Sequence, residues 1–140
     1  MLINQSPLVR EIIGAAIDVH RALGPGLFES AYEPCFVYEL VARGLTVASQ
    51  VPVPMIYKGV RLDCGYRADV LVNGEILVEL KCIERLLPIH TSQMVTYLKL
   101  LNLRQGLLIN FNVPVLVRGV KNVLLNQFGI PESDSIVPPW

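Results

Sequence analysis

The sequence predicts an α/β domain in which a central mixed β-sheet is flanked by helices. Apolar residues at helical spacing come first, short alternating stretches follow, and a further helical stretch leads into a short apolar run. The 140 residues suffice for one domain with its own core, and 52% of them are hydrophobic. We therefore expect a single domain over residues 1–140, with the element order α-α-β-β-β-β-α-β and a poorly patterned tail over 131–140.

Two helices are expected at the start of the chain. Ser6-Pro7 combines a good N-cap with proline at the first helical position, and apolar residues recur at helical spacing up to Leu23. Gly24-Pro25-Gly26 then breaks this helix. A second helix should run from about Leu27 to Arg43 and stop at Gly44.

The middle third of the chain carries the strand signals. Pro52 and Pro54 make the first strand an edge of the sheet, or end it. Lys58-Gly59 and Asn73-Gly74 lie between apolar stretches as turn signals, and the second is a strong hairpin signal. The expected strands are 45–53, 66–72 and 76–81. A first hairpin, made of 55–57 and 60–62, is expected between 45–53 and 66–72.

The last third begins with a helix after Pro88, expected from about Thr91 to Leu101. The apolar run 106–110 predicts a buried strand that this helix connects to the preceding sheet as a crossover. A weaker element covers 115–128. No repeat and no second domain is indicated.

Composition excludes several classes of protein. No apolar run reaches the ~18 residues that span a bilayer, and residues 1–5 lack the features of a signal peptide. The three cysteines, Cys35, Cys64 and Cys82, are odd in number and lack C-x-x-C spacing, so we expect reduced thiols in the cytoplasm. Cys82 follows Lys81, but alternation should point the thiol to the other face, which argues against a nucleophile.

The charged residues are unevenly distributed although the formal net charge is zero. Residues 1–80 hold six Lys/Arg and nine Asp/Glu, whereas residues 81–140 hold six Lys/Arg and three Asp/Glu. The later cations could follow a phosphate backbone or could be ordinary solvated charge. They include Arg85, Lys99, Arg104, Arg118 and Lys121. The high apolar content leaves a homodimer open.

Asp69, Glu79 and Lys81 form the candidate site. Glu79 and Lys81 are two residues apart in a strand and therefore share a face. With a two-residue turn at Asn73-Gly74, Asp69 would pair with Val78, and Glu79 would face away. A loop one residue longer, with a bulge, instead pairs Asp69 with Glu79. We predict the longer loop, because the chemistry requires both carboxylates on one face.

This D-x9-E-x-K pattern suits phosphodiester hydrolysis. Two converging carboxylates repel each other unless a cation lies between them, and hard oxygen ligands select Mg²⁺ or Mn²⁺. A bound divalent ion lowers the pKa of its water and offsets charge on phosphoryl oxygens. A lysine can hold the attacking water or stabilise the transition state. The structural alternative is a cross-strand ion pair between Asp69 and Lys81.

Two further pairs of residues are spaced so that each pair could lie on one face of a helix next to the candidate site. Glu29 falls in the first turn of the second helix, where a carboxylate suits the helix dipole, and it should share a face with Tyr32. Gln93 and Tyr97 are one turn apart on the following helix. They could orient a phosphate or the lysine, or could form a polar stripe on a half-exposed helix.

These motifs together resemble the GxxExxY protein family, a branch of the PD-(D/E)XK nuclease superfamily, over nearly the whole chain from Ile12 to Phe111. The stretches that carry the resemblance are Leu23-Gly24-Pro25-Gly26-Leu27-x-Glu29-Ser30-x-Tyr32, Asp63-Cys64-Gly65-Tyr66-Arg67-Ala68-Asp69, Val78-Glu79-Leu80-Lys81 and Leu87-Pro88-Ile89-His90. The resemblance implies a restriction-endonuclease-like core. It also implies that Glu29, Asp69 and Glu79 reach the metal and that Lys81 is catalytic.

The Gln93/Tyr97 pair is similar to the Q-x-x-x-Y helix motif of RecB-like exonucleases. Those enzymes also take a metal ligand from a histidine on an early helix. His20 lies on an early helix here, although at a different spacing, and a histidine in a last helical turn is often a dipole or packing residue.

The resemblance implies Mg²⁺- or Mn²⁺-dependent cleavage of nucleic acid, with DNA favoured over RNA. The alternative is a catalytically silent module on the same fold that binds nucleic acid or a protein. A plain structural dimer is a third reading, motivated by the apolar content. All four of Glu29, Asp69, Glu79 and Lys81 are present, which favours the enzyme.

Overall fold

The computed structural model describes residues 6–132, so most of the predicted 131–140 tail lies outside the described residues. The helices are α1 (Pro7–Leu23), α2 (Glu29–Ala42) and α3 (Pro88–Leu100), with a short 3-10 helix η2 (Leu116–Gly119). The strands are β1 (Val47–Pro52), β2 (Met55–Tyr57), β3 (Val60–Leu62), β4 (Arg67–Val72), β5 (Ile76–Lys81), β6 (Gln105–Asn110) and β7 (Val120–Leu124).

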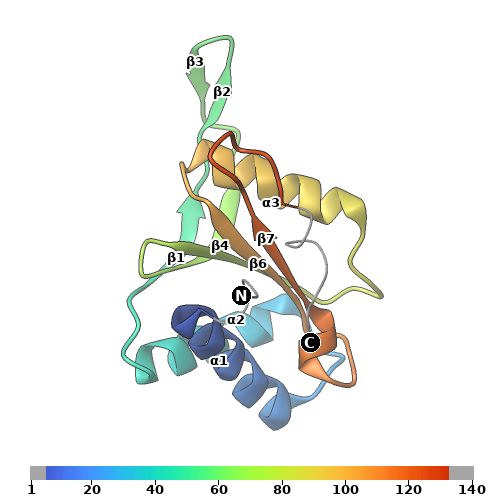
Figure 1. Cartoon of the computed structure of the whole chain (residues 1–140). Helices are drawn as coiled ribbons and strands as arrows, with labels where there is room; N and C mark the ends of the chain where they lie inside the picture. The colour runs from blue at the N-terminus through green and yellow to red at the C-terminus, as the bar shows by residue number, and fades with distance from the viewer. Residues whose placement is uncertain (1–5, 133–140) are drawn as a thin grey trace.

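A five-stranded mixed sheet forms the centre of the domain, in the order β1-β4-β5-β6-β7. Only β5 and β6 are parallel, because α3 carries the chain across the sheet between them. Helices α1 and α2 cover one face and α3 covers the other (Figure 1). The two faces bury separate apolar clusters, one containing Phe36 and the other containing Leu98. The predicted architecture of a mixed sheet between helices is confirmed.

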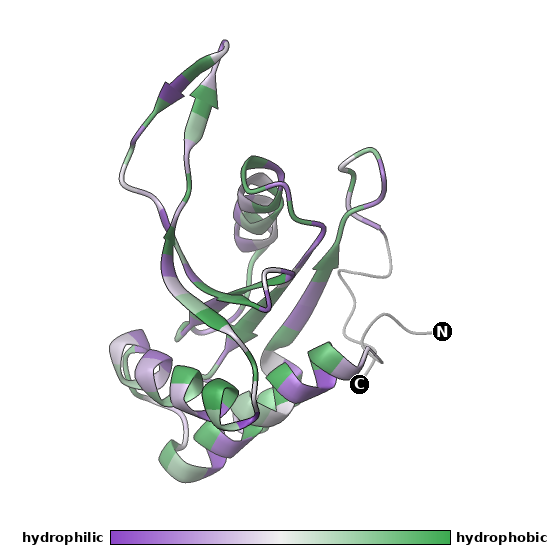
Figure 2. Cartoon of the chain, turned by 90° about the vertical axis from the view of Figure 1, so that its left-hand side faces the viewer, coloured by the Kyte–Doolittle hydropathy of each residue, from purple (hydrophilic) through white to green (hydrophobic). Residues whose placement is uncertain are grey.

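The β2–β3 hairpin forms a separate two-stranded sheet. It projects from the body of the domain beyond the end of β4 (Figure 1). Much of its ribbon is coloured as hydrophobic (Figure 2), and Ile56, Tyr57, Val60 and Leu62 are all exposed. The hairpin therefore adds surface next to the sheet and not core.

The structure has two strands more than the predicted order. One of them arises because the predicted order counts the first hairpin once, although both of its arms, 55–57 and 60–62, are confirmed as β2 and β3. The other arises because the weak element at 115–128 resolves into η2 and β7. Helix α3 also begins at Pro88, three residues before the predicted start, because proline is well tolerated in a first helical turn. Strand β1 ends at Pro52 and lies at the sheet edge, as predicted.

No helix in residues 6–132 is long and apolar enough to cross a membrane.

Candidate active site

The loop between β4 and β5 sets the position of the two central carboxylates. Val72 pairs with Ile76, and Val70 pairs with Val78, so three residues lie in the loop. This register places Asp69 opposite Glu79 and confirms the longer of the two predicted loops. Left-handed backbone angles at Asn73 and Gly74, with φ of 53° and 65°, shape the turn.

The backbone pairing of β4 with β5 ends at Val70 and Val78. Beyond this pair, the carboxylates of Asp69 and Glu79 accept the hydrogen bonds that backbone carbonyls would otherwise accept. The amide of Asp69 donates to Oε1 of Glu79 over 2.9 Å, and the amide of Leu80 donates to Oδ2 of Asp69 over 2.8 Å. Each carboxylate is therefore held by the backbone of the opposite strand. Amide donors to a carboxylate make short, strong hydrogen bonds, so the pair is positioned before any ligand arrives.

Glu79 is only 6% exposed and lies against a second carboxylate. Burial and the charge of Asp69 raise its pKa to about 8, against the lowering effect of the Asp69 amide and of Lys81. At neutral pH this carboxyl is therefore largely protonated. The site concentrates more negative charge than it can hold without a proton or a cation.

Lys81 is half-buried at the end of β5, and its charge acts on Glu79, which agrees with the predicted shared face. Within residues 6–132 its amine forms no ion pair. The alternative of a cross-strand ion pair between Asp69 and Lys81 is thus not observed. The amine is left available beside the carboxylates.

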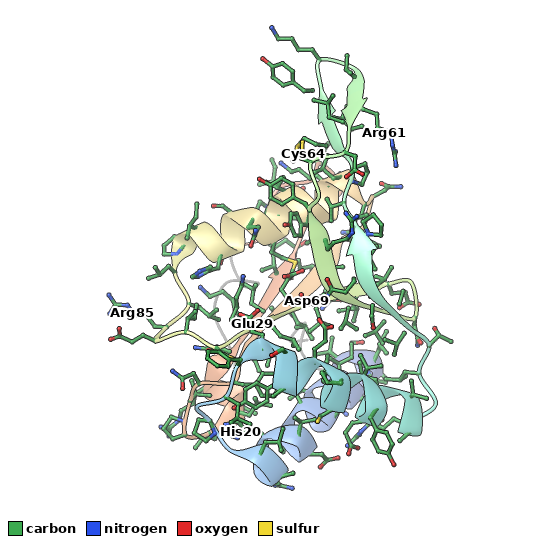
Figure 3. All side chains as sticks on the ribbon, turned by 180° about the vertical axis from the view of Figure 1, so that it is seen from behind. His20, Glu29, Arg61, Cys64, Asp69 and Arg85 are labelled. Atoms are coloured by element: carbon green, nitrogen blue, oxygen red, sulfur yellow. The ribbon has the colours of Figure 1, made fainter. Side chains whose placement is uncertain are left out.

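Helix α2 brings two acidic residues toward this site. Glu29 is its first residue and is exposed, and in Figure 3 it lies at the end of α2 nearest Asp69. Glu33, one turn further, is half-buried, and burial, Asp69 and Glu29 together raise its pKa, opposed by a hydrogen bond from Gln50. The sequence reading missed Glu33, although its i+4 spacing from Glu29 placed both on one helical face.

Gln50 is a second residue that sequence reasoning missed. The β1–β4 register places it opposite Asp69, and its Nε2 donates to Oε1 of Glu33 over 2.7 Å. Its φ of 51° is in the left-handed region, which is uncommon for a residue other than glycine. Nothing in the local sequence indicates this conformation, which places the Gln50 amide between β1 and α2.

Helix α3 contributes the predicted polar pair. Gln93 Nε2 lies 3.3 Å from the hydroxyl of Tyr97, which confirms that the two side chains meet. Tyr97 is 5% exposed, and burial followed by the charge of Glu79 raises its pKa. The exposed Tyr66 packs edge-on against the Tyr97 ring, and the two ring centroids are 6.2 Å apart. The phenol therefore lies near the carboxylates.

Tyr32 does not lie on the face of Glu29, contrary to expectation. Its ring is fully buried and stacks on Phe111 at 4.4 Å, while Glu29 is exposed. The Tyr32 hydroxyl donates to the carbonyl of Gly24 and accepts from the amide of Leu27. Three residues turn a helix by about 300°, so one side chain of such a pair can enter the core while the other stays outside. Tyr32 fixes the loop before Glu29 and cannot contact substrate directly.

His20 serves the fold in a similar way. Its Nε2 lies 2.8 Å from the carbonyl of Val113, and its ring is tilted against Phe111. It lies on α1, at some distance from Asp69 in Figure 3. The structure thus gives His20 a packing role and not a place among the carboxylates.

Cys82 points away from Lys81 and packs with the cluster beneath α1 and α2. Burial, with a smaller effect of Glu29, raises the pKa of its thiol to about 11. The thiol therefore stays protonated, which agrees with the expectation that it is not a nucleophile.

The donor set suits a divalent cation of the Mg²⁺ type, although the site is sparse. Among the described residues, no three His, Cys, Asp or Glu side chains are grouped to hold a metal, so Glu29 does not join Asp69 and Glu79. Magnesium needs only one or two protein carboxylates and keeps several waters. Asp69 Oδ1 and Glu79 Oε2 have no backbone donor in residues 6–132. The two carboxyl groups also share a side-chain hydrogen bond, so a cation would bind in place of the shared proton.

Comparison with known proteins agrees with this arrangement. A family model described as the PD-(D/E)XK nuclease superfamily matches residues 6–123, from the N-cap of α1 into β7. The match takes in Asp69, Glu79 and Lys81. No curated protein and no solved structure matches the chain. The restriction-endonuclease-like fold and the extent of this match together show that the chain belongs to the PD-(D/E)XK nuclease superfamily.

Proposed function

We propose that this protein is a metal-dependent nuclease that hydrolyses nucleic-acid phosphodiester bonds, with DNA as the favoured substrate and Mg²⁺ or Mn²⁺ as the cation. One observation carries the proposal. Asp69 and Glu79 are locked opposite each other by backbone amides at the point where β4 and β5 separate, with the unpaired amine of Lys81 on the same face.

Asp69 and Glu79 would hold the cation through the oxygens that no backbone amide occupies. When bound, a divalent ion lowers the pKa of a water and offsets the charge on the phosphoryl oxygens. Glu79 must give up its proton to bind the ion, because the neutral acid is a poor ligand. The amides of Asp69 and Leu80 keep the two carboxylates aligned throughout.

Lys81 would hold the attacking water or stabilise charge that develops on the phosphoryl group. Tyr97 and Gln93 would orient the phosphate or the amine from the α3 side, since the phenol already lies near Glu79. Glu29 remains a proposed third ligand, at the start of α2. It would need to move inward, or act through water, to reach the cation.

Three finer assignments belong to the same proposal. Gly26, Glu29 and Tyr32 support placing the chain with the GxxExxY proteins inside the superfamily. The free thiols of all three cysteines support a cytoplasmic location. The exposed apolar residues of the β2–β3 hairpin support a homodimer, which light scattering after size-exclusion chromatography would test.

The activity is tested with single-stranded DNA, duplex DNA and RNA, each with Mg²⁺, with Mn²⁺ and with chelator. We expect metal-dependent cleavage that falls at least about a hundredfold in Lys81→Ala and in Asp69→Asn. Lys99→Ala, which removes an exposed amine from the last turn of α3, is the matched control and should cleave like the wild type. Cleavage that survives both site substitutions would come from a contaminant, and binding without cleavage in any metal would favour the silent module.

A further inference from the structure

A pocket of about 260 Å³ lies beside the exit of β5. Three cationic side chains from three different elements line it. Arg85 comes from the loop after β5, Arg118 from η2, and Lys121 from β7. Half of the six Lys/Arg residues in the second part of the chain therefore line one pocket, although they are far apart in sequence. Arg85 lies at the outer edge of the molecule in Figure 3.

Arg85, Arg118 and Lys121 have no charged partner among residues 6–132. Within the described part of the chain, none of them forms a salt bridge, and no side-chain hydrogen bond engages them. The one carboxylate that lines the pocket, Glu84, is exposed next to Arg85 and forms no ion pair with it. Like charges that line one pocket without counter-charges repel each other, so the arrangement favours an anion as their partner.

The pocket is tied directly to the strand that carries Lys81. Asn110, which pairs with Lys81 in the parallel β5–β6 ladder, lines the pocket. Its buried amide group accepts from the amide of Ile83 and donates to the carbonyl of the same residue. The chain is therefore held at Ile83, between Lys81 and Arg85, and four residues span at most roughly 14 Å. The pocket lies within that reach of the proposed site.

A glycine lets η2 approach the sheet closely enough to close the pocket. Any side chain at Gly119 would collide with the backbone carbonyl of Asn110 and crowd Val113. Gly119 is buried and lines the pocket beside Arg118. The close contact thus fixes the position of Arg118 relative to Asn110 and, through Asn110, to β5.

We propose that Arg85, Arg118 and Lys121 form a subsite for one backbone phosphate of the nucleic acid, close to the phosphate that is cleaved. This assignment rests on the proposed nuclease function and names a contact outside its carboxylate–lysine centre. Two arginines suit the bidentate geometry of a phosphate, and the lysine adds a third charge. A contact of this kind positions the strand and carries no sequence preference.

The test is the salt dependence of binding to a labelled single-stranded oligonucleotide, measured by fluorescence anisotropy in chelator so that no cleavage occurs. The variant Arg118→Gln/Lys121→Gln is compared with Arg21→Gln/Lys99→Gln, which removes two exposed charges outside the pocket. We expect the pocket variant to bind about tenfold more weakly and its slope of log K against log salt to fall by about 1. The control pair should keep the wild-type slope.

Two further measurements separate the possible sources of the phosphate. The pocket variant should lose the same fold of affinity for oligonucleotides with a 5′-phosphate, with a 3′-phosphate and with only hydroxyl ends, because the subsite takes an internal phosphate. A loss confined to one phosphorylated end would overturn the assignment in favour of end recognition. Inorganic phosphate, added at constant ionic strength, should compete with the oligonucleotide more strongly in the wild type than in the pocket variant. Equal competition in the two proteins would also overturn the assignment. Thermal melts establish that each variant is folded. Arg85→Gln, a single substitution in an exposed loop, tests the third cation of the pocket by itself.

The subsite and the proposed activity can fail separately. If the wild type cleaves nucleic acid while the pocket variant binds and cleaves with unchanged salt dependence, the subsite is wrong and the nuclease stands. If the wild type cleaves nothing in any metal but the pocket variant still loses binding, the subsite stands and the activity is wrong.

Discussion

The amide nitrogen of Asp69 donates a 2.9 Å hydrogen bond to the carboxylate of Glu79, across the point where β4 and β5 stop pairing. Leu80 returns a hydrogen bond to Asp69, so each acid replaces a missing backbone partner. The same bonds that finish the sheet therefore also align the two candidate ligands. We therefore expect stability and cation binding to be coupled at this position.

The metal-free protein should become less stable as pH rises toward 8. Glu79 holds its proton up to about pH 8 in the folded state, whereas an ordinary glutamate loses it near 4.5. The folded state thus binds more protons between these values, and the stabilisation, complete below pH 4.5, is lost as pH rises through about 8. Thermal unfolding in chelator from pH 5 to 9 measures the effect, and half-buried Glu33 acts in the same direction.

Glu79→Gln provides the control for this pH dependence. Glutamine keeps an acceptor for the Asp69 amide but does not titrate, so the decline in Tm between pH 5 and 9 should become shallower. Saturating Mg²⁺ should also flatten the wild-type decline, because cation binding favours the ionised carboxylate. A variant that declines as steeply as the wild type would show that the pKa of Glu79 is not the cause.

The acids near the site should differ in their effect on cation binding. We expect Asp69→Asn to weaken Mn²⁺ binding at least tenfold, because it removes one of two ligands. Glu33→Gln should weaken it only a few-fold, since Glu33 contributes charge and no ligand atom. Glu29→Gln distinguishes a ligand from a bystander, with a tenfold loss expected for a ligand. Isothermal titration calorimetry gives these affinities, and Glu75→Gln, in the exposed loop at the far end of the hairpin, should match the wild type.

Tyr32→Phe should destabilise the fold by about 1–2 kcal/mol. The substitution keeps the stacking on Phe111 but removes the hydroxyl that joins the carbonyl of Gly24 and the amide of Leu27. Urea unfolding measures the change in free energy, and Tyr38→Phe, on the exposed side of α2, should change it by less than about 0.5 kcal/mol. Equal effects of both substitutions would contradict the role given to the Tyr32 hydroxyl.

The tip of the β2–β3 hairpin should be dispensable for folding. Replacing residues 56–61 with a short Asn-Gly turn removes only exposed side chains, so Tm should change by less than about 2 °C. Differential scanning calorimetry measures Tm, and the oligomeric state of the same protein shows whether the apolar tip holds a dimer together. A large fall in Tm of the monomeric variant would mean that the hairpin contributes to the core.

The central hairpin was predictable because its determinants are local. Asn73-Gly74 specifies a tight turn, and the alternation of β5 puts Glu79 and Lys81 on one face. Only the length of the loop was ambiguous, and the need for both carboxylates on one side selected the correct register. This requirement is decisive because a shift of one residue would reverse the face of every side chain in the strand.

Residues brought in by other elements were harder to predict. Helical spacing alone could not decide which of Glu29, Tyr32 and Glu33 faces the core, because a small rotation of α2 changes the answer. Glu33 approaches Asp69 only because α2 packs across the sheet. Gln50 joins them through a left-handed backbone angle that no local signal specifies.

The sequence by itself determined the mixed α/β architecture, the face shared by Glu79 and Lys81, and the position of the turn between Asp69 and Glu79. These features depend on periodicity and turn chemistry, which act over a few residues. The tertiary structure alone decided that Glu29 stays outside the carboxylate pair, that Tyr32 and His20 support loops, and that three cations far apart in sequence line one pocket. Those outcomes depend on how the helices and strands pack against one another, and packing is set by the whole core.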